Sequence, residues 1–208
     1  MNWLLGLGLL FAAFGDKLIA GAGGGPGCRG RVTVCNGVIK GPRSEYRLTD
    51  VDKLWLARAL LGEVSESAAR WQDSETKRGG AAVCWAMAQN FSLIRGPGDA
   101  VPRYSSFTLL LKAYCQPINP KWASSRTQKC REHPAACTER HLTRRRRVST
   151  ATLASMPAGL LDLVDQWVAG QIVNPIPGMT DWHARSFRGA RVQIAGNHFG
   201  VSEGRNLI

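Results

Sequence analysis

The sequence is short of acidic residues: 15 Asp and Glu stand against 27 Lys and Arg, for a formal net charge of +12 over 208 residues. Such an excess favours an anionic partner, which can be nucleic acid, a phosphate-bearing membrane or an acidic cell-wall polymer. Much of it is local, because residues 121–147 hold nine basic and two acidic residues, a net charge of 9 − 2 = +7. This segment ends in four arginines, Arg144 to Arg147. It can be a solvated loop or a binding surface for DNA or another anionic polymer, and the composition leaves both open.

Several signatures of common enzyme classes are missing as well. The Gly-rich stretch "GAGGGPG" lacks the Gly-Lys-Ser/Thr of a phosphate-binding loop and follows no predicted strand, so no nucleotide cofactor is expected. No G-x-S-x-G motif occurs, and His183 and His198 have no flanking triad pattern. Internal repeats and strand–helix alternation are also absent, while the 44% hydrophobic content is that of a globular domain. We therefore expect one domain with an appendage and no cofactor.

The N-terminus lacks the basic residues of a signal peptide, since no Lys or Arg precedes Lys17. Residues 3–14 are all apolar, but twelve helical residues span only about 18 Å of a hydrocarbon core about 30 Å thick. We interpret residues 1–27 as an apolar segment with a Gly-rich linker. It can dock against partner proteins or insert in a membrane.

Six cysteines form an even set. Cys28 and Cys35, and likewise Cys130 and Cys137, lie close together in loop-like sequence, which would suit local disulfides in an oxidising compartment. A zinc site is the alternative for the second pair, because two histidines lie beside it. Their spacing places all four side chains along one side of a helix, which does not suit tetrahedral zinc. We favour disulfides and expect no metal.

The apolar pattern predicts a mainly α fold with minor β structure, an α+β class. Residues 28–48 contain Asn36-Gly37 between valine-rich runs, which indicates a small β-hairpin extension. Residues 49–208 form the main domain. Helices are expected at about 51–66, 78–91, 106–114 and 158–170, whereas 115–148 is expected to be irregular and the chain from 174 loop-like.

One carboxylate stands out in the first of these helices. Asp52 is explained as a capping residue, and Glu66, between two serines, is expected to be solvated. Glu63 follows the apolar residues Leu60-Leu61 and Gly62, and the glycine would leave space for a ligand. An acid in apolar surroundings has a raised pKa and can stay protonated near neutral pH, which a general acid requires.

Three motifs resemble those of the SleB-type cell wall hydrolases. They are "LARALLGEVSES", "GGAAVCWAMAQNF" and, near the C-terminus, "GNHF", in that order. "AYCQPINPKW" and "NPIPG" are similar to elements of phage and bacterial relatives of that group. The similarity covers about residues 50–200 as scattered short motifs.

This resemblance implies a lysozyme-like fold and cleavage of the MurNAc–GlcNAc bond of peptidoglycan. Glu63 matches the family's catalytic glutamate, which would protonate the leaving oxygen. In a lytic transglycosylase the same carboxylate then acts as a base, so a single acid suffices, whereas an ordinary glycosidase needs two. We favour the one-acid mechanism, with Asp181 as the second acid if hydrolysis is the outcome.

Further residues are candidates for substrate binding. The amides of Gln116 and Asn119 could bind N-acetyl groups, and His198-Phe199 could close the groove opposite Glu63. Aromatic rings that could stack on sugars are Tyr104, Tyr114, Trp122 and Trp182. The sequence departs from the family pattern at Gln89-Asn90, where many relatives have Asn-Arg, and in the basic segment 121–147.

Two functions remain in view. The first is a peptidoglycan-cleaving enzyme carried by a phage virion, which acts in the bacterial envelope during genome delivery. The alternative is a non-enzymatic virion or envelope protein with a lysozyme-like fold that binds DNA or anionic polymer.

Overall fold

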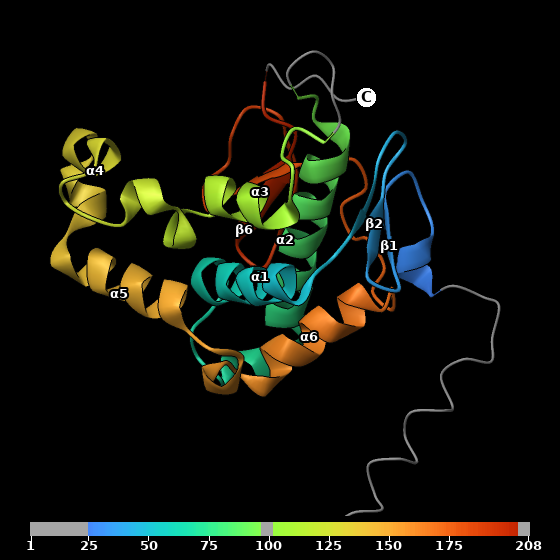
Figure 1. The fold of residues 1–208 in the computed structure, drawn as a ribbon, viewed down its shortest axis with the longest axis horizontal. Coiled ribbons are helices and arrows are strands. Elements are labelled where there is room, and N and C mark those ends of the chain that lie inside the picture. Colours follow the sequence, from blue (N-terminus) through green and yellow to red (C-terminus); the bar gives the residue numbers. More distant parts are fainter. Residues whose placement is uncertain (1–24, 97–101, 204–208) are drawn as a thin grey trace, which may run out of the picture.

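The computed structural model describes residues 25–96 and 102–203, and in these residues the fold is mixed α+β and about half helical. Helices α1, α2, α3 and α6 form the body, with one small antiparallel sheet beside it and a second packed on α2 (Figure 1). Residues 120–150, which contain helices α4 (Gln128–Glu132) and α5 (Glu139–Thr150), form an arm that projects from the body (Figure 1). The α+β class predicted from the sequence is thus confirmed. The apolar segment 1–24 lies outside the described residues.

The first sheet contains β1 (Thr33–Cys35), β2 (Val38–Lys40) and β3 (Glu45–Arg47). Asn36 and Gly37 turn the chain with φ of 48° and 74°, the left-handed pair that a two-residue hairpin requires. The hairpin prediction is therefore confirmed, and β3 extends it. The Cys28–Cys35 disulfide is present and ties the chain before β1 to its end.

Helix α1 (Asp50–Glu63) begins with a reciprocal cap between Thr49 and Asp52. The Asp52 carboxylate also accepts hydrogen bonds from the backbone and hydroxyl of Thr108, at 2.8 and 2.7 Å, in α3 (Phe107–Tyr114). These contacts hold the pKa of Asp52 below its usual value in spite of its burial. Asp52 therefore joins two helices in addition to its capping role.

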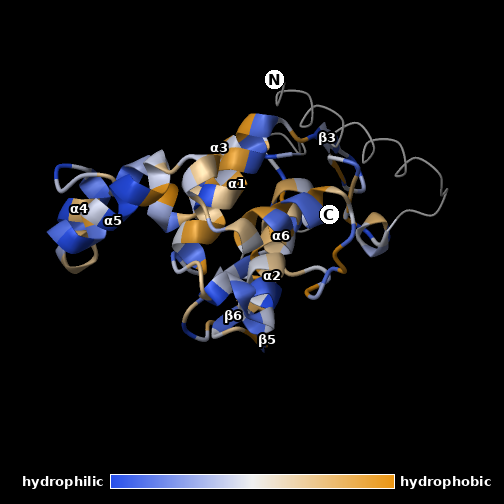
Figure 2. Ribbon diagram, turned by 90° about the horizontal axis from the view of Figure 1, so that it is seen from below, coloured by the Kyte–Doolittle hydropathy of each residue, from blue (hydrophilic) through white to orange (hydrophobic). Residues whose placement is uncertain are grey.

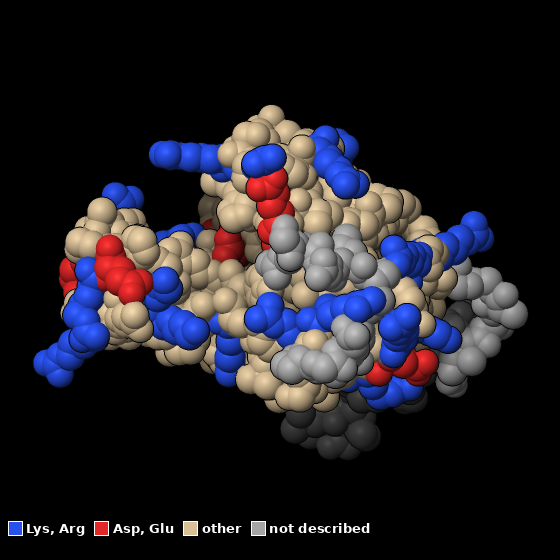
Figure 3. Space-filling model, turned by 90° about the horizontal axis from the view of Figure 1, so that it is seen from above, with Lys and Arg blue, Asp and Glu red and all other residues tan. Residues whose placement is uncertain are grey.

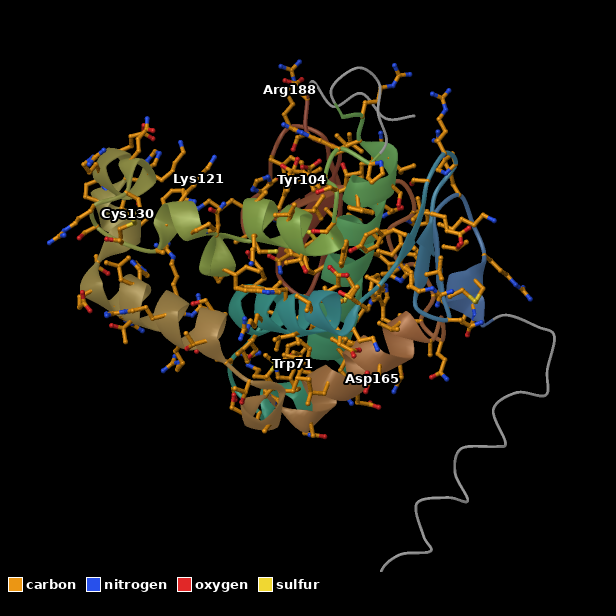
Figure 4. All side chains as sticks on the ribbon, in the orientation of Figure 1. Trp71, Tyr104, Lys121, Cys130, Asp165 and Arg188 are labelled. Carbon is orange, nitrogen blue, oxygen red and sulfur yellow. A yellow bond between two sulfur atoms is a disulfide. The ribbon has the colours of Figure 1, made fainter. Side chains whose placement is uncertain are left out.

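Helix α2 (Ser74–Leu93) runs through the middle of the body and is almost wholly buried. It packs against α6 (Ala158–Val168), where Trp85 and Trp167 meet edge to face with ring centroids 6.1 Å apart. Trp71, labelled in Figure 4, closes the core at the start of α2. Cys84 is completely buried here, as its apolar surroundings predict.

The arm was expected to be irregular, and this expectation was wrong. It contains α4 (Gln128–Glu132) and the twelve-residue α5 (Glu139–Thr150). Both are largely hydrophilic (Figure 2), so they show little of the apolar periodicity that predicts helices. The Cys130–Cys137 disulfide and Leu142 form a small core of their own beside Trp122.

The C-terminal part was expected to be loop-like, which was also wrong. Strands β4 (Asp181–His183), β5 (Ala190–Ile194) and β6 (Asn197–Gly200) form an antiparallel sheet in the order β4-β6-β5. The sheet packs on α2, which places Phe199 in the main core.

Short 3-10 turns connect these elements: η1 (Pro26–Cys28), η2 (Arg70–Gln72), η4 (Gln116–Ile118), η5 (Pro120–Trp122), η6 (Pro134–Cys137) and η7 (Leu153–Ser155). Within the described ranges, no helix is both long and apolar enough to cross a membrane.

Candidate active site

Glu63 is the last residue of α1 and is partly buried. The preceding Gly62 packs against η4, since a Cβ at this position would lie 2.3 Å from the Cβ of Pro117. The expected space beside the glycine is therefore filled by protein, and that interpretation is corrected. Gly62 is required for the close approach of η4, which places Gln116 next to Glu63.

The carboxylate of Glu63 accepts two hydrogen bonds, one from the side chain of Trp182 in β4 and one from the backbone N–H of Gln116. Burial disfavours its charged form and raises its pKa from 4.5 to about 7. The two hydrogen bonds and the positive charge of Arg144 act in the opposite direction, but desolvation is the larger effect. Glu63 can therefore hold a proton at neutral pH and also release it.

Arg144 of α5 connects the arm to this helix end. Its guanidinium donates to the backbone oxygen of Gly62 at 2.7 Å and to Glu66 at 2.5 Å. Arg147 donates to the other carboxylate oxygen of Glu66, at 2.8 Å from Nε. Glu66 was expected to be solvated, but it pairs with both arginines. Part of the basic run thus positions α5 against the C-terminal end of α1.

The register of the second sheet decides which of its residues lie near Glu63. Trp182 and Phe199 are opposite each other, so they share one face of the sheet. Side chains alternate along a strand, and Asp181 and His198 therefore lie on the other face. Phe199 is fully buried on the Trp182 side. The prediction that His198 and Phe199 together close a groove opposite Glu63 does not fit this register.

Asp181 is buried and accepts hydrogen bonds from the Thr180 hydroxyl at 2.7 Å and the Ser202 backbone at 3.2 Å. Moreover, none of the groups that shift the pKa of Glu63 is a carboxylate. The geometry thus offers no support for Asp181 as a second acid at Glu63.

Gln116 is the first residue of η4, and Asn119 follows its last residue. The Gln116 side chain is exposed while its backbone contacts Glu63, so its amide is available near the acid. The Asn119 amide is engaged locally, because it donates to the Ala113 oxygen and accepts from the Lys121 backbone, both at 2.9 Å. Asn119 shapes the turn and has less capacity to bind a sugar.

The predicted stacking residues are spread over the molecule. Tyr104 and Tyr114 pack edge to face on the body beside α3, with Tyr104 labelled in Figure 4. Trp122 belongs to the arm, where it stacks on His133 at 5.7 Å. Of the four aromatic candidates, Trp182 is the one whose side chain forms a hydrogen bond with Glu63.

Gln89, noted only as a departure from the family pattern, anchors the loop before β4. It donates to the backbone oxygens of Ile176 and Met179 at 2.9 and 2.8 Å, and it accepts from Asn174 and the Gly178 backbone. Asn90 donates to the Thr180 oxygen at 3.2 Å. The sequence feature that could have predicted this anchoring role is the pair of amide side chains, Gln89 and Asn90, near the end of an apolar helix.

Two hollows flank Glu63 along the chain. One, of about 360 Å³, is lined by Val64 and Ser65 together with Asp73, Thr76 and Ala195 among others. The other, of about 880 Å³, is lined by Leu61, by Glu66 to Ala68 and by residues between Arg147 and Pro157, and the Glu63 side chain lines neither hollow. The surface is also hollowed between the arm and the body, with acidic atoms recessed there (Figure 3).

Residues 25–96 and 102–203 contain no group of three or more His, Cys, Asp or Glu side chains that could hold a metal ion. The Cys130–Cys137 disulfide also removes two thiolates from the zinc site considered above. The two disulfides indicate an extracellular or otherwise oxidising compartment.

Comparison of the chain with protein-family models, with curated proteins and with solved structures finds no match. The resemblance to SleB-type hydrolases therefore remains a prediction from the quoted motifs.

Proposed function

We propose that the protein is a peptidoglycan-cleaving glycosidase with a lysozyme-like catalytic domain and that Glu63 is its general acid. The observation that carries the proposal is the raised pKa of Glu63, about 7, at a helix end that is still partly exposed. A protonated carboxyl in this position can donate its proton to the oxygen of a glycosidic bond. We propose peptidoglycan as the substrate class because the motifs around Glu63 resemble those of the SleB-type cell wall hydrolases.

A lytic transglycosylase mechanism fits the site better than a two-carboxylate one. Glu63 would first protonate the leaving oxygen and then, as a carboxylate, take the proton of the MurNAc 6-hydroxyl as that oxygen attacks C1. Trp182 and Gln116 donate hydrogen bonds that favour the charged form, so they would stabilise Glu63 after the first transfer. The product would carry a 1,6-anhydro end.

Digestion of purified peptidoglycan, followed by mass spectrometry of the sugar chains, tests the proposal. The parent protein should release 1,6-anhydro muropeptides, and Glu63→Gln should lower the rate at least a hundredfold. Glu45→Gln, an exposed substitution on β3, is the matched control. A Glu63→Gln protein as active as its parent would rule out the mechanism, and sugar chains left intact by the parent would rule out the class.

The setting that we propose is a phage virion whose enzyme opens the wall during genome delivery. A non-enzymatic protein that binds DNA or anionic polymer remains the second candidate, supported by four basic residues of the arm that pair with no carboxylate in the described part of the chain. These are Lys121, Arg126, Arg131 and Arg140. DNA binding that falls steeply with salt, without any muropeptide product, would favour this candidate.

A further inference from the structure

A further hollow, of about 220 Å³, lies between α1, α3, the η4–η5 segment and α5. Its polar lining consists of Asn119, Ser149 and three cations, Lys112, Arg145 and Arg146, and its apolar lining includes Trp55 and Ile118. None of the lining side chains is acidic. Such a hollow would bind an anion with a small apolar body.

Arg145 provides a charge that the protein does not neutralise. It is only 8% exposed, and its guanidinium donates to the backbone oxygens of Trp122 and Ala136, both at 2.9 Å, and to the Cys137 sulfur, while it lies over the Trp122 ring. These groups are all uncharged, and no described carboxylate forms a salt bridge with Arg145. Burial and the neighbouring cation Arg144 both lower its pKa. Because burying an unpaired charge is costly, an anion in the adjacent hollow would be bound favourably.

Lys112, on α3, supplies a second charge to this hollow. Its Nζ lies 3.9 Å from the centroid of the Trp55 ring, and it forms no ion pair with a described residue. Arg146 is partly neutralised, since it pairs with Glu139 at 2.5 Å, although both side chains are well exposed. Lys112 is therefore the cation best able to move onto a ligand.

We propose that this hollow binds the carboxyl-terminal residue of a peptide. The volume admits one small residue, Lys112 and Arg145 would face its carboxylate, and Trp55 and Ile118 would contact its side chain. A free amino acid is disfavoured, because its ammonium group would meet the same cations. Pro117 lines this hollow, whereas Gly62, the residue before Glu63, packs on the same proline. A peptide bound here would thus lie next to the segment that contacts Glu63, yet outside that contact.

Titration of the ¹⁵N-labelled full-length protein with N-acetyl-alanyl-alanine, followed by NMR, tests this proposal. The acid should give saturable shifts at the Trp55 indole N–H and at the backbone N–H groups of Ile118 and Asn119. The C-terminal amide of the same dipeptide, and free alanine, should bind at least tenfold more weakly. Lys112→Gln should weaken binding of the acid at least fivefold. Lys53→Gln, which changes a cation of α1 that does not line the hollow, should leave binding unchanged.

Equal binding of acid and amide, or equal affinity in the two lysine variants, would overturn the proposal, as would the absence of saturable shifts. The D,D and L,L forms of the dipeptide distinguish a cell-wall stem peptide, which ends in D-alanine, from a protein terminus. The readout does not depend on wall cleavage, because a Glu63→Gln protein should bind the acid as the parent does. A negative result for peptide binding can therefore be distinguished from a negative result for the glycosidase proposal.

Discussion

Trp182 of the C-terminal sheet donates a hydrogen bond to Glu63, the last residue of α1. The contact joins two parts of the chain that are 119 residues apart, and it gives the carboxylate a donor that favours its ionised form. Burial acts against this donor and prevails, which leaves the pKa of Glu63 at about 7. The balance between these two effects can be measured.

Replacement of Trp182 by Phe should raise the pKa of Glu63 above 7. The variant keeps an aromatic ring but loses the N–H that stabilises the carboxylate, while the burial that disfavours the charge remains. Carboxyl ¹³C NMR across a pH titration measures the change. Trp122→Phe, in the arm, should leave this pKa unchanged. A pKa equal to that of the parent in Trp182→Phe would show that the indole has no influence on Glu63.

The raised pKa also predicts a pH-dependent stability difference between Glu63→Gln and the parent. Between pH 4.5 and 7 the unfolded chain releases the Glu63 proton while the folded protein keeps it. The parent is stabilised fully below pH 4.5 and loses this contribution as the pH rises through about 7, at most about 3 kcal/mol in all.

Urea unfolding at pH 4 and pH 8 should therefore show that Glu63→Gln gains stability relative to the parent at the higher pH. The same comparison for Glu45→Gln should show no such gain. A stability difference between Glu63→Gln and the parent that is the same at both pH values would contradict the raised pKa.

Arg144→Gln should raise the pKa of Glu63, since it removes the positive charge that favours the carboxylate. It should also lower the free energy of unfolding by about 1–3 kcal/mol, because it leaves the Gly62 oxygen and Glu66 without this donor. Arg140→Gln, on the exposed side of α5, is the control. NMR titration and urea unfolding of both variants provide the two measurements, and equal results for the two would argue against a positioning role for Arg144.

Local sequence was sufficient to predict some elements and insufficient for others. Asn36-Gly37 predicted its hairpin because the turn needs two residues with positive φ, and the capping box at Thr49 is a local signal too. Helix α5 lacks an apolar stripe. It is held in place instead by hydrogen bonds from Arg145 inside the arm and from Arg144 to α1. Its existence depends on contacts that the local pattern does not contain.

The candidate site was predictable only in part for the same reason. Glu63 was identified from the residues before it and from the motifs, whereas Trp182 was one of four equivalent aromatic candidates. Only the register of β4 and β6 separates Trp182 from Asp181 and His198, which lie on the opposite face. That register depends on a sheet whose strands are three to five residues long and rich in polar residues, so they show no clear alternation of apolar and polar residues from which a strand could be predicted.

The two disulfides provide a matched pair of variants, because both join cysteines that are seven positions apart. Chain entropy assigns each such loop about 2.5 kcal/mol of stabilisation. Cys130→Ser/Cys137→Ser should raise amide hydrogen exchange in α4 and the first turn of α5, whose small core contains this disulfide. Cys28→Ser/Cys35→Ser should raise exchange around β1 and leave the arm unchanged. Exchange that rises equally throughout the body in the first variant would show that the arm is not a separate unit.

Gln89→Leu should destabilise the loop that leads to β4 and thereby disturb Trp182. The amide makes four hydrogen bonds to this loop. Leucine would leave the Met179 oxygen without its donor and the Gly178 N–H without its acceptor, whereas the Ile176 oxygen would still accept from the Met179 N–H. Each unpaired group costs about 1–3 kcal/mol, so a loss of several kcal/mol in the free energy of unfolding is expected. Urea unfolding with the exposed substitution Gln171→Leu as control measures the effect. A Gln89→Leu protein as stable as this control would mean that the loop is held by its own turns and not by α2.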